Sequence, residues 1–435
     1  MRIAIVGSGI SGNTAAYCLH NAGNTITVYE RDLRLGGHAA TVDIQYDGEK
    51  IAVDTGFIVY NDHNYPNMVA MLKHLNVPTQ VSDMSFAVSL DRGEFEWAGR
   101  SGTLAQVVNG LFAKRRNIAN PRYWLMLSEI LRFQKLSIKE FNAGKLDGLT
   151  LGEYLDSRKF SAGFRDKYIV PMGAAIWSTP AAQMLEFPAS SFISFFDNHR
   201  LLQWDRPIWR TITGGSRNYV RELTKSYRDR VRLGAAVTSI TRTEQGVVVK
   251  DSLGHVDTYD KIVIAAHAPD ALAMLSDASE REQDILSAVK YRPNDVYLHR
   301  DTRLMPKRKA AWAAWNFLRE GTDETADVSV TYWMNLLQGI NPKKPLFVSL
   351  NPPFAPEASK VFARFSYDHP QFDKVALRAQ TELNDVQGKR NTWYCGAWTG
   401  FGFHEDGLRS GLEIARALGA EAPWLVADER KVKAA

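Results

Sequence analysis

Cysteine is almost absent from this chain, and long apolar runs are missing altogether. Only Cys18 and Cys395 occur among 435 residues, which excludes a disulfide framework and favours a reducing compartment. No window approaches the ~20 apolar residues that a transmembrane helix needs. The first apolar run begins at residue 2, so we expect no signal peptide. These features predict a cytoplasmic protein.

The chain as a whole also has no large excess of charge of either sign. Lys and Arg number 53 against 48 Asp and Glu, and 45% of the residues are hydrophobic. A chain of this length and composition is typical of a globular protein with room for two domains. No nucleic-acid recognition motif accompanies the basic residues, and no metal-ligand pattern stands out. We therefore expect neither nucleic acid nor a metal as a partner.

A glycine-rich turn stands between two short apolar runs at the start of the chain. The runs cover residues 2–6 and 25–29, the turn over 7–12 reads GSGISG, and an amphipathic stretch follows it. Glu30 comes 18 residues after Gly12 (30 − 12), close to the ~20 typical of the acid that binds a ribose. Strand, G-x-G-x-x-G, helix, strand and acid together predict a βαβ unit that binds a dinucleotide.

Segments further along resemble the flavin amine oxidase and carotenoid desaturase superfamily. The run from Glu30 through residues 36–41, which read GGHAAT, resembles its E-x5-G-G-R-x-x-T segment, and residues 54–56 resemble its D-x-G signature. Residues 392–396 and 405–411 resemble its closing motif, in which a strand leads to a helix whose N-terminus faces the flavin. Such an N-terminus stabilises the negative charge of reduced flavin. The resemblance implies a non-covalently bound FAD.

Three positions depart from the superfamily pattern. His38 stands where the family usually has Arg, so we expect a weaker and pH-dependent phosphate contact there. Ala397 replaces the Asp that usually follows the strand glycine, and Asp406 is inserted in the closing Glu-Gly pair.

The glycine motif and the resemblance together give a set of residues that we expect to contact FAD. They are Gly7, Gly9, Ile10, Ser11, Gly12, Glu30, Arg31, Gly36, Gly37, His38, Thr55, Gly56, Phe57, Val237, Gly396, Phe403, His404, Glu405, Asp406 and Leu408.

The flavin segments are scattered along the chain, which implies a discontinuous domain. We expect an α/β protein with a Rossmann-like FAD-binding domain of the amine oxidase and desaturase type, formed by residues 1–60, 206–268 and 390–435. An α+β substrate domain would take up residues 61–205 and 269–389. That arrangement is what the superfamily resemblance implies.

The expected substrate domain is rich in aromatic and amide side chains. Its segments resemble a narrower bacterial family of predicted NAD/FAD-binding proteins, and they are Ile176-Trp177-Ser178, Phe195-Phe196-Asp197-Asn198-His199, Tyr332-Trp333-Met334-Asn335 and Leu350-Asn351-Pro352. Members of that family accompany cyclopropane-fatty-acid-synthase-like methyltransferases, and one branch is linked to furan fatty acid synthesis. The resemblance implies a flavoprotein that desaturates a methyl-branched phospholipid acyl chain, with the methyltransferase as a functional partner.

His404 is the candidate catalytic base because it sits where the closing motif meets the flavin. The alternative is that only its backbone contacts the cofactor. Three other functions stay open: a fatty acid double-bond isomerase, an amine oxidase, and a non-enzymatic flavin-binding redox sensor or accessory subunit. An amine oxidase is disfavoured because the motif has Phe403 as one aromatic wall but lacks the second Tyr of an amine cage.

One stretch concentrates positive charge. Between residues 100 and 140 there are eight Lys or Arg against two Glu, interleaved with large apolar residues such as Trp124. A basic helix of this kind is able to lie on an anionic membrane surface at the inner face of the membrane. The simpler alternative is a solvated basic face over an ordinary core helix.

Overall fold

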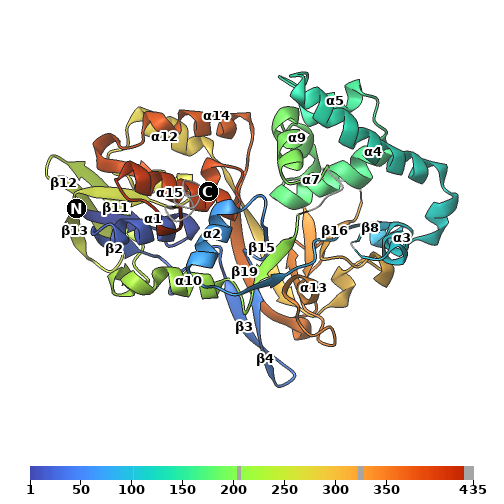
Figure 1. Ribbon diagram of the computed structural model, residues 1–435, viewed down its shortest axis with the longest axis horizontal. Coiled ribbons are helices and arrows are strands. Elements are labelled where there is room, and N and C mark those ends of the chain that lie inside the picture. Colours follow the sequence, from blue (N-terminus) through green and yellow to red (C-terminus); the bar gives the residue numbers. More distant parts are fainter. Residues whose placement is uncertain (101, 203–206, 322–327, 426–435) are drawn as a thin grey trace, which may run out of the picture.

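The fold is described from a computed structural model over residues 1–100, 102–202, 207–321 and 328–425. Two lobes lie side by side, and α2 (Pro66–His74), β15 (Tyr291–His299) and β19 (Val361–Pro370) lie near the boundary between them (Figure 1). The N-terminal strand belongs to one lobe, and most of the helices between residues 104 and 198 belong to the other. Within the described residues, no helix combines the length and the apolar character needed to cross a bilayer.

A parallel sheet forms the centre of the first lobe. Its strand order is β10-β2-β1-β14-β20, and every neighbouring pair is parallel. The residues of β1 after Arg2 are buried, as expected for an apolar run covered on both faces of a parallel sheet. The strands are β1 (Arg2–Val6), β2 (Thr25–Tyr29), β10 (Val231–Arg232), β14 (Lys261–Ile264) and β20 (Thr392–Tyr394).

Segments that are far apart in the sequence therefore share one sheet. Helix α1 (Ile10–Asn21) connects the first two strands and packs against α15 (His404–Ala417) at the other end of the chain. A small antiparallel sheet completes this lobe, with β11 (Val237–Thr243), β12 (Gly246–Asp251) and β13 (Val256–Tyr259) in that order. The α/β class expected from the sequence is confirmed.

Helices that the sequence assigns to the substrate domain pack instead on the first lobe. Their apolar faces join the hydrophobic clusters of the parallel sheet, as Met68 and Ile285 illustrate. We therefore assign these helices to the FAD-binding domain. The other domain boundaries expected from the sequence stay a prediction. Besides α2, these helices are α11 (Ala268–Met274), α12 (Glu280–Ala288) and α14 (Lys374–Glu382), next to α10 (Arg217–Thr224), which the sequence already placed there.

A larger mixed sheet supports the second lobe. Its strand order is β19-β15-β18-β17-β16-β7-β8, and within it only β16 and β7 pair in parallel among the described residues. The strands not yet given are β7 (Phe86–Leu90), β8 (Phe95–Gly99), β16 (Trp315–Arg319), β17 (Ser329–Trp333) and β18 (Phe347–Leu350). Smaller sheets pair β3 (Thr41–Tyr46) with β4 (Glu49–Asp54), and β9 (Trp209–Ile212) with β5 (Tyr60–Asn61) and β6 (Thr79–Val81).

A group of helices covers one end of this sheet (Figure 1). Helix α4 begins where Asn120 accepts a hydrogen bond from the backbone N–H of Arg122 and Pro121 takes the first position. The helices are α3 (Leu104–Leu111), α4 (Pro121–Asn142), α5 (Leu151–Ser157), α6 (Ala162–Phe164), α7 (Val170–Trp177), α8 (Ala181–Leu185) and α9 (Ala189–Asn198), with α13 (Met334–Gln338) elsewhere on the sheet.

Short helical turns complete the connections between these elements. They are η1 (Asp91–Gly93), η2 (Arg115–Ala119), η3 (Arg165–Ile169), η4 (Lys225–Arg230), η5 (Thr302–Leu304), η6 (Lys309–Ala311), η7 (Ala358–Lys360), η8 (Leu383–Asp385), η9 (Lys389–Asn391) and η10 (Ala397–Thr399).

Candidate flavin site

The turn after β1 has the shape of a pyrophosphate cradle. Gly7 has a φ of +97°, and a Cβ placed on it would lie 2.4 Å from the carbonyl oxygen of Ala265. A Cβ on Gly12 would lie 2.0 Å from the carbonyl oxygen of Gly7. At Gly9, by contrast, an added Cβ meets nothing within 4 Å. The fold needs the outer two glycines, whereas the open space at Gly9 fits a bound ligand.

Helix α1 starts directly at this open position. Gly9 is its N-cap, and no side chain there accepts a hydrogen bond. The first N–H groups of a helix have no partner within the helix, and its dipole favours an anion at that end. Ile10 and Ser11 form the first turn, so their backbone lies where the sequence places the phosphates. The residues present thus fit the pyrophosphate of a dinucleotide.

Glu30 lies at the end of β2 and faces the same turn. One oxygen of its carboxylate accepts hydrogen bonds from the backbone N–H and the hydroxyl of Ser8, at 2.9 and 2.5 Å, and the other accepts from the N–H of Asp32 at 2.8 Å. Only 7% of Glu30 is exposed. The carboxylate is therefore fixed beside the cradle, as a ribose-binding acid requires. Arg31 points outward and pairs with Asp270 at 3.5 Å.

Gly36 and Gly37 pack against the glycine-rich turn of residues 7–12. The N–H of Gly36 donates to the carbonyl of Ser8 at 3.0 Å, and a Cβ on Gly37 would lie 3.0 Å from the Cα of Gly9. The tertiary structure thus brings residues 36–37, 28 positions downstream of the cradle (36 − 8), into direct contact with it. A larger side chain at Gly37 would press on this contact, whereas at Gly36 an added Cβ would lie 2.8 Å from the carbonyl oxygen of Ala39.

Residues 55–57 run beside the same segment. The N–H of Phe57 donates to the carbonyl of His38 at 2.9 Å, and a Cβ on Gly56 would overlap that carbonyl at 2.1 Å. Thr55 donates its N–H to the carbonyl of Ala40. These contacts hold the D-x-G segment against the G-G-H segment.

Asp54, the acid of the D-x-G signature, has a structural role. Asp54 accepts hydrogen bonds from the hydroxyl of Thr41 at 2.6 Å, from the backbone and hydroxyl of Ser216, and from the amide of Gln338. Burial raises its pKa to about 6. Asp54 therefore fastens β4 to the start of α10 and to the second lobe.

His38 places its ring among other aromatic side chains. The ring meets Tyr367 edge-on at 5.0 Å between centroids and His369 at 5.4 Å. Burial, together with the neighbouring His369, holds the pKa of His38 well below its ordinary value. A neutral imidazole cannot supply the positive charge that Arg supplies at this position of the superfamily pattern.

Both acids at the start of α15 are used by the protein itself. The Glu405 carboxylate accepts from the backbone N–H and side-chain amide of Asn67, at 3.0 and 2.7 Å, and from the N–H of Met68 at 3.0 Å. Asp406 accepts from the N–H groups of Phe401 and Phe403. Glu405 thus caps α2, and the inserted Asp406 shapes the turn. With both carboxylates engaged, the N–H groups of the first turn of α15 remain for the negative charge of a flavin.

His404 is the first residue of α15 and is held on two sides. Its ring stacks on Phe57 at 3.8 Å with the planes 8° apart, and its Nε2 lies 2.6 Å from the hydroxyl of Tyr219. Burial lowers the pKa of His404 to about 3 and raises that of Tyr219 well above its usual value. Both groups are therefore neutral and are joined by a hydrogen bond. The catalytic role of His404 stays a prediction.

An aromatic wall adjoins the start of α15. Phe403 stacks on Phe195 at 5.0 Å, and Phe195 stacks on His199 at 3.8 Å. Trp177 also packs against Phe195, with the ring centroids 4.6 Å apart. Burial lowers the pKa of His199 to about 4, so this ring is also neutral. The second-lobe motifs on α7 and α9 that the sequence singles out thus meet the closing motif.

Two site neighbours on β19 escaped the sequence reasoning. The hydroxyl of Tyr367 lies 2.7 Å from that of Thr55, and the Nδ1 of His369 lies 3.1 Å from the hydroxyl of Ser178. Burial lowers the pKa of His369 to about 4. Their spacing of two residues, which puts them on one face of a strand, was the signal available. Asn335, in contrast, binds its own loop through the backbone of Asn341.

The remaining predicted contacts frame the site. Val237 opens β11, Gly396 has its N–H bonded to the Ser410 hydroxyl at 3.0 Å, and Leu408 is buried in the core between α1 and α15. Cys395 is buried, and burial raises the pKa of its thiol to about 12. Such a thiol is a poor nucleophile, which fits a cofactor that is not tethered there.

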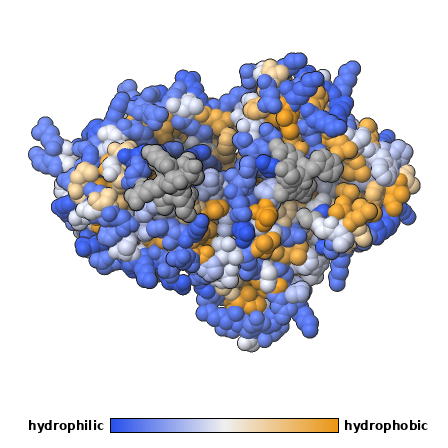
Figure 2. Space-filling model, in the orientation of Figure 1, coloured by the Kyte–Doolittle hydropathy of each residue, from blue (hydrophilic) through white to orange (hydrophobic). Residues whose placement is uncertain are grey.

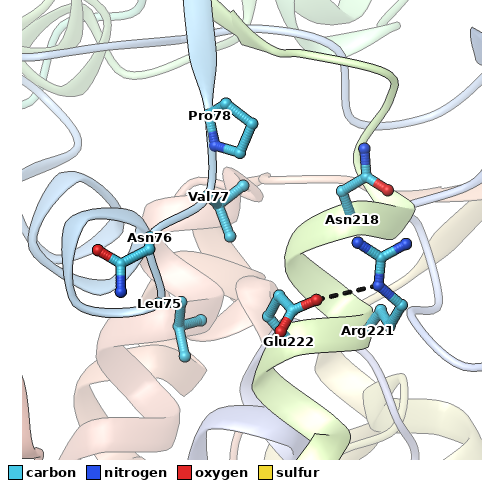
Figure 3. A pocket seen from close by; sticks show the side chains of 7 residues that line it. All are labelled: Leu75, Asn76, Val77, Pro78, Asn218, Arg221 and Glu222. Atoms are coloured by element: carbon cyan, nitrogen blue, oxygen red, sulfur yellow. Dashed lines mark hydrogen bonds and ion pairs between the residues drawn. The ribbon is translucent and has the colours of Figure 1, made fainter.

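A separate hollow of about 340 Å³ lies between the end of α2 and α10 (Figure 3). No residue of the expected flavin set lines it. Its two charged side chains, Arg221 and Glu222, bond to each other at 3.0 Å. The hollow is lined by Leu75, Asn76, Val77, Pro78, Asn218, Arg221 and Glu222.

Solved structures share this architecture over almost the whole chain. A putrescine oxidase bound to putrescine is 14% identical, with 96% of this chain and 99% of that chain covered and a TM-score of 0.67. A conjugated-linoleic-acid-producing fatty acid isomerase from P. acnes is 16% identical, with 95% and 98% covered and a TM-score of 0.65. Cyclohexylamine oxidase from Brevibacterium oxydans IH-35A is 16% identical, with 96% and 98% covered and a TM-score of 0.67. At these identities the likeness concerns the fold.

Sequence comparison adds local matches and a family. A 15-cis-phytoene desaturase of Synechococcus elongatus is 40% identical over 77 residues, which is 18% of this chain and 15% of that protein. Achacin of Lissachatina fulica is 27% identical over 169 residues, which is 35% and 31% of the two chains. The model of the flavin containing amine oxidoreductases matches residues 10–344. With the cradle, Glu30 and α15 in place, the chain belongs to this family and is an FAD-dependent oxidoreductase.

Proposed function

We propose that this protein desaturates the acyl chain of a lipid. The observation that carries the proposal is the neutral, aromatic wall of Phe403, Phe195 and His199 beside the start of α15. Phe195 is buried, whereas Phe403 and His199 are partly exposed. Uncharged rings of this kind suit a hydrocarbon chain, which they can align without charge. Bound FAD supplies a two-electron acceptor for hydride from carbon.

The chain's own residues would then exclude water and receive the second hydrogen as a proton. Removal of two hydrogens from adjacent carbons sends a hydride to the acceptor and a proton to a base. His404 would take that proton at Nδ1, with its Nε2–H donating to the hydroxyl oxygen of Tyr219. Tyr219 would position the ring and stabilise its protonated form.

A cationic amine finds little support at this wall. The two carboxylates nearest to it in sequence, Glu405 and Asp406, are occupied by hydrogen bonds from α2 and from the turn before α15. Burial also raises the pKa of each of them. A substrate that needs a free carboxylate would have to displace these bonds, whereas an acyl chain needs none.

Two of the similar proteins support a hydrocarbon substrate, while the putrescine and cyclohexylamine oxidases share the same fold. One is a fatty acid isomerase with this fold, and another is a phytoene desaturase that shares a short stretch of sequence. The resemblance to the narrower bacterial family suggests a methyl-branched phospholipid acyl chain as the first substrate to try. A cyclopropane-fatty-acid-synthase-like methyltransferase would then act before this protein.

Anaerobic mixing with a methyl-branched phospholipid tests the proposal. We expect the visible flavin absorbance to bleach and mass spectrometry to find an acyl chain lighter by two hydrogens. An isomerase would move a double bond with no net change in mass and no lasting bleaching. An amine oxidase would be bleached by small amines and leave the lipid intact, and either result would overturn the proposal.

The role of His404 needs a matched variant. His404→Ala should lower the bleaching rate by ~10²–10⁴ with FAD still bound. His299→Gln serves as the control because His299 is also buried but bonds to Ser349 on the sheet of the second lobe. A His404→Ala rate within a few-fold of the parent would reduce His404 to a cofactor contact, while the product mass alone would still decide the reaction.

A further inference from the structure

An apolar patch lies on the surface of the helical group of the second lobe. Of the fourteen large apolar side chains that are exposed among the described residues, six fall between residues 104 and 131. Figure 2 shows apolar residues gathered at this end of the molecule, over α3 and α4. We call this surface the α3–α4 face, and its apolar members are Leu104, Val108, Ile118, Trp124, Leu125 and Leu131.

Trp124 is held in place on this face by contacts with its neighbours. Trp124 donates its ring N–H to the carbonyl of Ile118 at 2.8 Å and packs against Phe112 at 5.3 Å, yet half of it is exposed. Seven residues make almost two helical turns, so Leu131 points to the same side of α4 as Trp124. The opposite side of α4, with Met126 and Phe133, is buried in the core. Leaving large apolar groups rigidly exposed indicates a surface that contacts something apolar.

The charge around this face is positive. Arg122, Lys135 and Lys139 are exposed on α4. The two acids of the stretch do not offset them on the surface, since Glu129 is buried against the N–H of Ser161 and Glu140 is paired with Arg158.

A second basic group flanks the first. Arg115 and Arg116 are exposed in η2, between α3 and α4. Lys114 beside them pairs with Glu94 at 3.2 Å. The exposed arginines therefore extend the positive rim from α4 to the end of α3.

We propose that the α3–α4 face docks on an anionic phospholipid bilayer. Apolar side chains would enter the boundary between headgroups and acyl chains, while the surrounding Lys and Arg meet the lipid phosphates. A bilayer accepts both kinds of contact without a matching shape. A folded protein partner would require that shape, and a nucleic acid would leave the six apolar groups unused.

The docking face and the aromatic wall belong to one hydrophobic unit. The cluster that contains Tyr123 and Phe133 of α4 also contains Phe195, and Phe403 packs against it. Docking would thus set the lobe that carries the wall against the phase in which acyl chains reside. The inference rests on the proposed function only for the identity of the substrate.

Vesicle flotation of the FAD-loaded full chain tests the docking. The vesicles contain phosphatidylcholine alone or phosphatidylcholine mixed with phosphatidylglycerol, at low and at high salt. We expect binding to the anionic vesicles that weakens as salt rises, because exposed charges are screened, and much weaker binding to the neutral ones. Absence of binding to anionic vesicles at low salt, or equal binding to both kinds, would overturn the proposal.

Charge reversal supplies the first variant pair. Each basic residue near an anionic surface contributes about a five-fold gain in partitioning, so Arg122→Glu with Lys135→Glu and Lys139→Glu should lower binding by at least ~100-fold. The control reverses three exposed lysines on other surfaces and should bind almost as the parent does. Its positions are Lys290, Lys343 and Lys374.

Removal of apolar groups supplies the second pair. Leu104→Ser with Leu125→Ser should weaken binding at every salt concentration, because it deletes the part that enters the bilayer. The control, Leu253→Ser with Val256→Ser, alters equally exposed side chains in the first lobe. Flavin content reports that each variant is folded. If each variant binds vesicles as well as its control does, the α3–α4 face is not the docking surface.

Activity separates this inference from the proposed function. A charge-reversed variant that oxidises detergent-solubilised phospholipid normally but fails on vesicles would support both. If the protein binds vesicles but oxidises no acyl lipid, the docking proposal stands and the proposed substrate is wrong. Oxidation of vesicle lipid at the parent rate by the charge-reversed variant would remove the docking alone.

Discussion

Gly9 offers the sharpest test of the site, because the fold itself does not require a glycine there. Its backbone has φ −65° and ψ −179°, which other residues adopt freely, and an added Cβ meets nothing within 4 Å. Alanine reduces the entropy of the unfolded chain, worth roughly 0.4–1 kcal/mol, but is a poorer N-cap than glycine by a similar amount. Gly9→Ala should therefore change the stability of the FAD-free protein by less than about 1 kcal/mol.

Binding of FAD should respond very differently. A Cβ at this position keeps the phosphates away from the first N–H groups of α1, and each charge-assisted hydrogen bond is worth about 1.5–3 kcal/mol. Loss of one such bond raises the dissociation constant by ~10-fold to ~100-fold, and loss of two by ~100-fold or more. The larger Gly9→Val should abolish binding altogether.

Gly12→Ala is the matched comparison. Its Cβ would lie 2.0 Å from the carbonyl oxygen of Gly7, so the backbone has to move, and overpacking of this kind costs roughly 1–3 kcal/mol or more. Urea unfolding of the FAD-free proteins and titration with FAD give both quantities. The reasoning is refuted if Gly9→Ala destabilises the FAD-free protein as much as Gly12→Ala does, or if it binds FAD as the parent does.

The other predictions concern single groups with defined surroundings. Glu30→Ala should weaken FAD binding by roughly 2–4 kcal/mol, since it removes a charged acceptor beside the cradle. Unchanged affinity in a titration would show that the adenine half of FAD does not bind beside Glu30. Glu405→Ala should lower the unfolding free energy of the FAD-free protein by about 3 kcal/mol because α2 loses its cap, and Glu405→Gln should cost less in the same urea experiment. Burial lowers the pKa of His299 from 6.5 to about 4. Between these two values only the unfolded chain takes up the proton. The unfolding free energy is therefore highest above pH 6.5 and falls by about 2 kcal/mol by pH ~5. His299→Gln should flatten the measured dependence of stability on pH over that interval, and an unchanged slope would contradict the assignment. Acid precipitation should release the flavin into the supernatant, whereas flavin in the pellet would point to a tether such as Cys395.

The sequence alone determined the cofactor half of this protein. Periodicity and spacing are local properties, and β1, the glycine turn, α1 and β2 form where the short apolar runs and the turn residues predict them. The match of residues 10–344 to the flavin amine oxidoreductase family agrees with that prediction. The positions of Gly36 and Gly56 could be anticipated only through the superfamily resemblance, since nothing in their own neighbourhood demands the close approaches they make.

Roles that depend on neighbours distant in the chain were out of reach. The sequence offered Glu405 and Asp406 as flavin contacts, but their carboxylates hold α2 and the turn before α15. It placed α12 in the second domain, although Ile285 packs against the parallel sheet. An apolar face predicts burial but not the partner that buries it, and an acid motif does not say which N–H groups will reach it.

The tertiary structure decided what surrounds the reactive position. It brought His404 onto Phe57 and Tyr219, and it set His369 beside His38. Each of these pairs joins segments that are remote in sequence, and burial, which only the complete fold provides, keeps their imidazoles neutral. Local sequence determines which backbone forms, whereas the protonation and contacts of a buried side chain depend on every element packed around it.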